Sequence, residues 1–162
     1  MMIVGLPRSR TAWLSVFMSQ SKTYFHHEAI NGCYSMDDYR AKTKGCGDST
    51  TGFIPLLNEI KSKKMVIIKK NDEQINACIK WCDSQYKADS REFILGMALQ
   101  LSCMEGLVIN QSDINDALPD IWNHLVDDDW DDKYTNLTKL NIQVNSTEIN
   151  NQAARAFYAT LQ

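Results

Sequence analysis

The chain has 162 residues, of which 44% are hydrophobic, and its formal net charge is −3. This length and composition predict one globular domain over residues 1–162 that buries roughly 70% of its unfolded surface. The negative charge disfavours general nucleic-acid binding, and no apolar run reaches the ~18 residues of a membrane span. No basic region followed by a long apolar one opens the chain, so we expect no secretory signal and a cytoplasmic protein.

A strand over residues 1–4 is the first predicted element, and Gly5 and a polar turn follow it. Gly5 lets the backbone leave the strand at angles that a side chain forbids, and Pro7 fixes one φ angle. The N–H groups of the next helix point beyond the strand end. Arg8 and Arg10 add planar cationic donors suited to phosphate or sulfate, so this stretch predicts a phosphate-binding loop.

This loop departs from the nucleotide-hydrolase pattern GxxxxGKS/T. Aligned on Gly5, that pattern requires Gly, Lys and Ser or Thr where Arg10, Thr11 and Ala12 stand. The lysine that reaches the β- and γ-phosphates is therefore absent, and so is the hydroxyl that holds Mg²⁺. The sequence disfavours a metal-assisted ATPase or GTPase and predicts no metal site.

Short strands and helices alternate along the rest of the chain. In the first half we expect a helix over residues 10–20, a strand over 23–25, a helix over 36–44 that Ser35 and Asp38 cap, a strand over 46–49 and a helix over 53–60. In the second half we expect a strand over residues 65–68, a helix that Asn71 or Asp72 caps, a helix over 90–104 and a strand over 107–109. A helix is expected from Ser112 or Asp113 to about residue 125, and Pro119 should kink or split it. A solvated acidic run around Trp130 and a terminal helix from Asn145 or Ser146 complete the chain. This alternation predicts an α/β fold of three layers, α/β/α, with a mainly parallel sheet.

Ligands of open parallel sheets bind outside the carboxyl ends of the strands. Lys69 and Lys70 follow the strand over residues 65–68, so they are predicted to reach an anion held by the first loop. His26 and His27 lie at the same end of the second strand, where a general base removes a proton from an acceptor hydroxyl. Alternation along a strand sends only one of the two into the cleft, and the sequence leaves open which one.

Further polar candidates lie nearby, and the cysteines give a different signal. Glu28 follows the two histidines, and Asp48, Ser49 and Thr50 are candidates for contact with an acceptor. Five cysteines without a CxxC pair predict reduced thiols in a cytosolic protein: Cys33, Cys46, Cys78, Cys82 and Cys103.

The first loop resembles the 5′-phosphosulfate-binding loop of the sulfotransferases, which runs from a strand through Pro-Lys/Arg-Ser-Gly-Thr-Thr-Trp-Leu into a helix. Six residues match this pattern: Pro7, Arg8, Ser9, Thr11, Trp13 and Leu14. Arg10 replaces the family's glycine, and Ala12 replaces its second threonine. The chemistry of that family needs no metal, in keeping with the absent magnesium ligand.

A later stretch supports the same resemblance. Sulfotransferases carry an Arg after a later strand and a Ser eight residues on, both of which bind the nucleotide's 3′-phosphate. Lys70 and Cys78 occupy these positions, with a charge that lacks the bidentate fork and a thiol that is a poor donor. Ser112, Asp113 and Ile114 stand where the family has a Glu-Asp-Leu segment after a strand. The family's C-terminal glycine-rich basic loop has no counterpart.

The resemblance implies a P-loop nucleoside triphosphate hydrolase-like fold and a transferase. The implied reaction moves a sulfuryl group from 3′-phosphoadenylyl sulfate to a hydroxyl or amine of a small acceptor, leaving 3′-phosphoadenosine 5′-phosphate. The implied nucleotide-binding residues are Pro7, Arg8, Ser9, Arg10, Thr11, Ala12, Lys70 and Cys78. Arg8 also has a catalytic role, because its guanidinium stabilises charge on the leaving phosphate oxygen, and His26 or His27 is the base. Arg10 either adds a cation to the site or points outward.

Two alternatives stay open at this stage. One is a nucleotide or nucleoside kinase, which shares the phosphate-loop architecture but requires Mg²⁺ and a loop lysine. The other is a non-catalytic protein that binds or sequesters a nucleotide, which the short chain and the weakened pair Lys70 and Cys78 favour. The expected partners are small molecules, and the sequence predicts neither the acceptor nor the oligomeric state.

Overall fold

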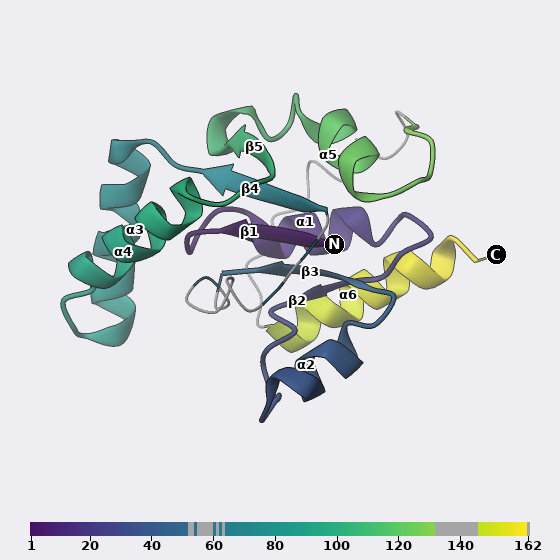
Figure 1. The fold of residues 1–162 in the computed structure, drawn as a ribbon, viewed down its shortest axis with the longest axis horizontal. Helices are drawn as coiled ribbons and strands as arrows, with labels where there is room; N and C mark the ends of the chain where they lie inside the picture. Colours follow the sequence, from purple (N-terminus) through teal and green to yellow (C-terminus); the bar gives the residue numbers. More distant parts are fainter. Residues whose placement is uncertain (52–53, 55–59, 61, 63, 132–145, 162) are drawn as a thin grey trace.

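The computed structural model describes residues 1–51, 54, 60, 62, 64–131 and 146–161. Its centre is a five-stranded sheet in the order β2-β3-β1-β4-β5, and each pair of neighbouring strands is parallel (Figure 1). The strands are β1 (Met2–Gly5), β2 (Phe25–His27), β3 (Gly47–Thr50), β4 (Met65–Lys69) and β5 (Leu107–Asn110). The predicted α/β class with a mainly parallel sheet is confirmed.

Helices cover both faces of the sheet. They are α1 (Thr11–Met18), α2 (Met36–Lys42), α3 (Asp72–Tyr86), α4 (Arg91–Ser102), α5 (Leu118–Leu125) and α6 (Ser146–Ala159), with a short 3-10 turn η2 (Gln111–Asp113) before α5. The apolar side chains of α1 and α5 form one core with the sheet, and those of α3 and α4 form a second core on the other face. Helix α6 packs against α1 and β2. Within the described part of the chain, every helix is too short or too polar to cross a lipid bilayer.

Alternation along the two central strands produces these two cores. Ile3 and Val66 point to the face that α1 and α5 cover, whereas Val4 and Ile67 point to the face of α3 and α4. All four side chains are buried, as expected for strands in the interior of a parallel sheet.

Several predicted elements differ from the observed ones. The strand expected over residues 23–25 is β2, which begins only at Phe25 because the Ser21 hydroxyl accepts the Thr23 N–H (3.1 Å) and holds that residue in a turn. The helix expected from Ser112 to residue 125 is split, and Pro119 lies in the first turn of α5, where its missing N–H has no helical acceptor to lose. The helix expected over residues 53–60 lies almost wholly outside the described residues.

Helix α4 also departs from its predicted face. The sequence suggested a broad apolar face, but only the stripe of Ile94, Met97 and Leu101 is buried against the sheet. Phe93 is 59% exposed and Leu99 is 67% exposed. The sheet contacts a single helical stripe, so Phe93, Leu95 and Leu99 of α4 face outward.

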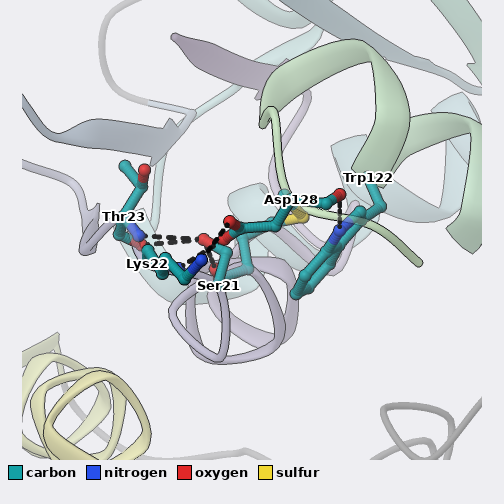
Figure 2. A network of polar contacts seen from close by, with 6 residues as sticks. Ser21, Lys22, Thr23, Trp122 and Asp128 are labelled. Atoms are coloured by element: carbon teal, nitrogen blue, oxygen red, sulfur yellow. Dashed lines mark hydrogen bonds and ion pairs between the residues drawn. The ribbon is translucent and has the colours of Figure 1, made fainter. Parts of the chain in front are cut away.

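The acidic segment after α5 is anchored through Asp128, which was predicted to be solvated (Figure 2). Its carboxylate accepts the Lys22 N–H at 2.8 Å and lies 3.4 Å from the Lys22 ammonium. Its carbonyl accepts the Trp122 indole N–H at 2.8 Å. The Trp130 ring packs against Phe17 and Trp122, so the prediction of a solvated face is wrong for Asp128 and Trp130.

Candidate anion-binding site at the carboxyl edge of the sheet

The loop over residues 6–10 leaves the sheet at its topological switch point. Strand β1 is central, with β3 on one side and β4 on the other. The chain runs from β1 to β2 at one edge of the sheet, whereas it runs from β4 to β5 at the other edge, so the connections after β1 and β4 run in opposite directions. Ligands of open α/β sheets bind in the crevice that forms at such a point, outside the carboxyl ends of the strands. The arrowhead of β4 in Figure 1 points to the edge of the sheet where this loop lies.

The loop backbone turns sharply twice before the helix begins. Arg8 has a φ of 67° and Arg10 a φ of 61°, both in the left-handed region that non-glycine residues rarely adopt. The Ser9 N–H donates to the Leu6 carbonyl at 3.1 Å, and the Leu14 N–H donates to the Arg10 carbonyl at 2.9 Å as the first bond of α1. Two strained residues, one on each side of Ser9, mark a site where the surrounding structure has to hold the chain in place.

The start of α1 is positively charged, and no acidic residue in its first turn offsets that charge. Arg10 is the N-cap residue and makes no side-chain cap, and the first turn holds no acidic residue. The N-terminus of a helix is the positive end of its dipole, and cations placed there are unfavourable unless an anion joins them. Arg8 and Arg10 therefore add positive charge at this end of α1, which suits a negative group.

Ser9 lies at the centre of the loop and is completely buried. Its Oγ is the only buried side-chain oxygen or nitrogen among the described residues without a hydrogen-bond partner. The close approach of Gly5 makes this burial possible, because a Cβ there would lie 2.8 Å from the Ser9 Cβ and 3.1 Å from the Ile68 Cβ. A buried hydroxyl without a partner normally costs about 1–3 kcal/mol, so its presence indicates a position for a ligand.

Lys70 comes to the loop from the end of β4. Its ammonium donates to the Arg8 carbonyl at 3.2 Å and to the Gln111 side-chain oxygen after β5. Burial lowers the pKa of Lys70, the nearby Cys78 thiol opposes this shift, and the charge of Arg8 adds to it. Within the described residues no carboxylate pairs with Lys70, so its charge is available to an anion at the loop.

The two arginines turn to opposite faces of the sheet. The guanidinium of Arg8 lies 5.7 Å from the centroid of the Trp81 ring on α3. Arg10 donates to the Asn115 side-chain oxygen at 2.8 Å, and its guanidinium lies 4.6 Å from the centroid of the Trp13 ring. Arg8 is exposed and Arg10 half-buried, so the stacking rings hold each cation beside the loop without neutralising it.

The other predicted nucleotide-binding residues fall into two groups. Pro7, Thr11 and Ala12 belong to the loop and the first turn, and the Thr11 carbonyl accepts the Ser49 hydroxyl at 2.7 Å. Cys78 is 2% exposed and packs in the core below α3. Burial raises the pKa of its thiol to about 11, with a smaller contribution from Cys82, so Cys78 is a neutral core residue beside Lys70.

The two predicted bases lie apart from the loop. His27 is buried, its Nδ1 lies 3.0 Å from the Ser49 carbonyl, and its backbone is bonded to Asn150 of α6. His26 lies on the opposite face, with its ring 4.6 Å from the ring of Tyr24. Burial and the charge of Lys42 lower the pKa of His26. Strand β3 lies between β2 and β1, so the backbone of both histidines is roughly 10 Å, two strand spacings, from β1, the strand that leads into the loop.

Two carboxylates lie near these histidines: Glu28 directly follows β2, and Asp48 is the second residue of β3. Asp48 is 1% exposed and accepts the Tyr39 hydroxyl at 3.1 Å and the Ala29 N–H at 3.0 Å. Burial raises the pKa of Asp48 to about 7, against the effect of these donors. Glu28, with a φ of 54°, accepts hydrogen bonds from Thr50 and Thr51.

Three neighbours of the loop were not predicted from the sequence: Trp81, Gln111 and Asn115. Gln111 and Asn115 are polar residues just after β5, and the rule that ligand sites follow strand ends was sufficient to single them out. No such signal existed for Trp81, which lies in the middle of a helix.

No family model, curated protein or solved structure matches this chain. The class that fold and site define is thus an α/β protein with a mainly parallel sheet and a candidate anion-binding loop after its central strand. Among the residues that the structure describes, no three His, Cys, Asp or Glu side chains converge as a metal site requires.

Proposed function

We propose that the loop over residues 6–10 binds the phosphosulfate end of 3′-phosphoadenylyl sulfate and that the protein is a sulfotransferase-like transferase of the P-loop class. One observation carries the anion site: the Ser9 hydroxyl is fully buried just before α1, without a partner among the described residues, in a loop that carries two arginines and is contacted by the Lys70 ammonium. The choice among anions rests on the resemblance of residues 7–14 to the sulfotransferase loop. The cytoplasmic location stays a prediction.

The residues around the loop fit one end of this nucleotide better than the other. Ser9 and the first turn of α1 offer donors for the 5′-phosphosulfate, and Arg8 and Lys70 offer charge. The 3′-phosphate is less well provided for, because Cys78 is buried in the core and the Lys70 ammonium is directed to the loop. Lys70 therefore serves the 5′ end in this proposal, whereas the resemblance assigned it to the 3′ end.

When bound, the nucleotide supplies an activated sulfuryl group whose bond to the phosphate oxygen breaks as the acceptor oxygen or nitrogen bonds to sulfur. The chain stabilises charge on the departing phosphate oxygen through Arg8 and Lys70. The proton of the acceptor goes to His26 or His27. Burial and Lys42 lower the pKa of His26, so it is neutral and able to accept a proton at pH 7.

A second candidate function is supported by the position of these histidines. Both are on β2, at the far side of β3 from the loop, and the ring of His27 is already bonded to the Ser49 carbonyl. A protein that binds the nucleotide without turnover needs the loop and Lys70 but no base. Non-catalytic binding or sequestering of the nucleotide is therefore the alternative.

Titration of the purified protein by calorimetry separates the candidates. We expect 3′-phosphoadenosine 5′-phosphate to bind without metal, and Arg8→Glu to abolish this binding while Arg91→Glu, an exposed arginine at the start of α4, does not. ATP that binds only with Mg²⁺ instead supports a kinase. Equal affinity of Arg8→Glu and the parent chain contradicts the site. Sulfuryl transfer to any of a panel of phenols, alcohols and amines then distinguishes the enzyme from the binder.

A further inference from the structure

A cavity lies between the sheet and the helices α3 and α4, on the face of the sheet opposite α5. It has a volume of about 330 Å³. Sites for small molecules typically occupy ~300–1,000 Å³ and are lined mainly by apolar side chains. The cavity borders the loop through Leu6, but most of its wall comes from β4, α3 and α4.

The wall of this cavity is apolar over most of its surface. Ile67 forms the floor on β4, Ile75 contributes from α3, and Leu101 and Met104 contribute from α4 and the turn that follows it. Val108 on the edge strand β5 lines the cavity and is 52% exposed. An apolar body that enters the cavity removes this surface from water, which is the main source of binding energy for such ligands.

The polar groups of the cavity favour a negative head group. Lys69 and Lys70 line it at the carboxyl end of β4, together with Asp72 at the start of α3. Two cations thus face one carboxylate, and no ion pair involves either lysine among the described residues. Lys70 donates to the loop and to Gln111, so the exposed Lys69 is the cation that is free to meet a ligand.

We propose that this cavity binds a small amphiphilic anion, with an apolar chain or ring between α3 and α4 and a carboxylate or similar head group at Lys69. This inference goes beyond the proposed function and does not depend on it, because the head group is assigned to Lys69, which the loop does not use, although Lys70 borders both sites. The loop offers backbone and hydroxyl groups to a compact, highly charged anion. The cavity offers apolar surface and a single free ammonium to a weakly charged one.

Calorimetric titration with sodium octanoate tests the proposal. We expect saturable binding at one site, weaker binding of octanol, and no binding of octylammonium, because a cation meets Lys69 and Lys70. Ala98→Phe places a ring in the cavity and should weaken octanoate binding by at least ~10-fold. Leu99→Phe is the matched control on the same helix, because Leu99 is 67% exposed and does not line the cavity.

Charge variants test the assignment of the head group. Lys69→Gln should weaken octanoate binding about 5-fold and leave octanol unchanged, whereas Lys80→Gln on the exposed side of α3 should have no effect. Absence of octanoate binding to the folded parent chain, equal binding by Ala98→Phe, or stronger binding of octylammonium overturns the proposal. Affinity for 3′-phosphoadenosine 5′-phosphate in Ala98→Phe should stay within about twofold, so failure of either proposal is seen separately.

Discussion

The carboxyl edge of the sheet has two halves of opposite character. In the half formed by β2 and β3, Glu28 and Asp48 are held by hydrogen bonds from hydroxyl and N–H groups of their own neighbourhood. At the ends of β1 and β4, and counting only the described residues, the buried Ser9 hydroxyl has no partner and the ammonium of Lys70 meets carbonyl oxygens but no carboxylate. Both halves are polar and both contain strained residues, Glu28 in one and Arg8 and Arg10 in the other.

This difference shows that polarity by itself does not mark a binding site. The hydrogen bonds around the carboxylates close within the protein, so that half is explained as a network that holds the β2–α2 connection against β3. Around the loop, the buried Ser9 hydroxyl has no acceptor among the described residues, and a buried donor without an acceptor is unfavourable. In our proposal, a bound anion supplies the acceptor that the loop half lacks, whereas the donors of the carboxylate half already have acceptors.

The largest expected effect is the loss of stability when Asp48 is removed. Asp48→Ala leaves the Tyr39 hydroxyl and the Ala29 N–H buried without their acceptor, so the free energy of unfolding should fall by about 3 kcal/mol. Urea denaturation at pH 7 measures this change. Nucleotide affinity should stay within about twofold. A parallel loss of affinity in the isosteric Asp48→Asn variant, which keeps the packing, contradicts the division into two halves.

Lys70 should show the opposite pattern. Lys70→Met removes a charge that the loop uses, so we expect the affinity for 3′-phosphoadenosine 5′-phosphate to fall about 30-fold, or about 2 kcal/mol. Stability should change by less than about 1 kcal/mol, because methionine fills a similar volume without a buried charge. The control is Lys64→Met, whose lysine pairs with Asp127 at the opposite end of β4. Equal affinities of the two variants contradict the role of Lys70.

A Ser9 variant tests the same contrast, because the Ser9 hydroxyl has no hydrogen-bond partner in the part of the chain that the structure describes. Ser9→Ala should leave the free energy of unfolding unchanged or slightly higher, while affinity for the nucleotide falls about 5-fold. Ser21→Ala is the matched control, because that buried hydroxyl donates to the Met18 carbonyl at 2.7 Å and its loss should lower stability by about 1 kcal/mol. Thermal unfolding and calorimetry of both variants check this. A clear loss of stability in Ser9→Ala indicates a structural hydroxyl.

The last prediction concerns the pH dependence of stability. The pKa of Asp48 is raised to about 7 by burial, so the folded chain holds a proton on it between about pH 4 and pH 7 that the unfolded chain has released. Its contribution to stability is therefore fully present below about pH 4 and is lost as pH rises towards 7. Urea denaturation across this range should show that Asp48→Asn removes this part of the slope. Parallel profiles for parent and variant contradict it.

Local sequence signals predicted the elements whose causes are local. The strand over residues 65–68, with its run of apolar residues between lysines, is β4, and the Asn71 cap is observed as a capping box with Gln74. The glycine and two arginines after the first strand indicated a loop, and that loop lies at the carboxyl edge. The boundary of β2 was two residues out, because the Ser21 turn that delays it is not visible as a periodic pattern.

The site was less predictable than the fold. His26 and His27 were expected near the loop, but the strand order places β3 between them and β1, and a sequence does not reveal strand order. Cys78 has the spacing of a ligand-binding residue, yet the helix turns its thiol into the core. Both outcomes depend on which face or edge an element presents to its neighbours.

By itself, the sequence determined the order of strands and helices, the parallel α/β class and the position of a cationic loop after the first strand, because these depend on periodicity, caps and glycine within a few residues. Tertiary structure alone decided that Lys70 reaches the Arg8 carbonyl across 62 positions of the chain and that Ser9 is buried without a partner. It also decided that the histidines lie beyond β3. These contacts join residues far apart in the chain, so they exist only once the sheet has assembled.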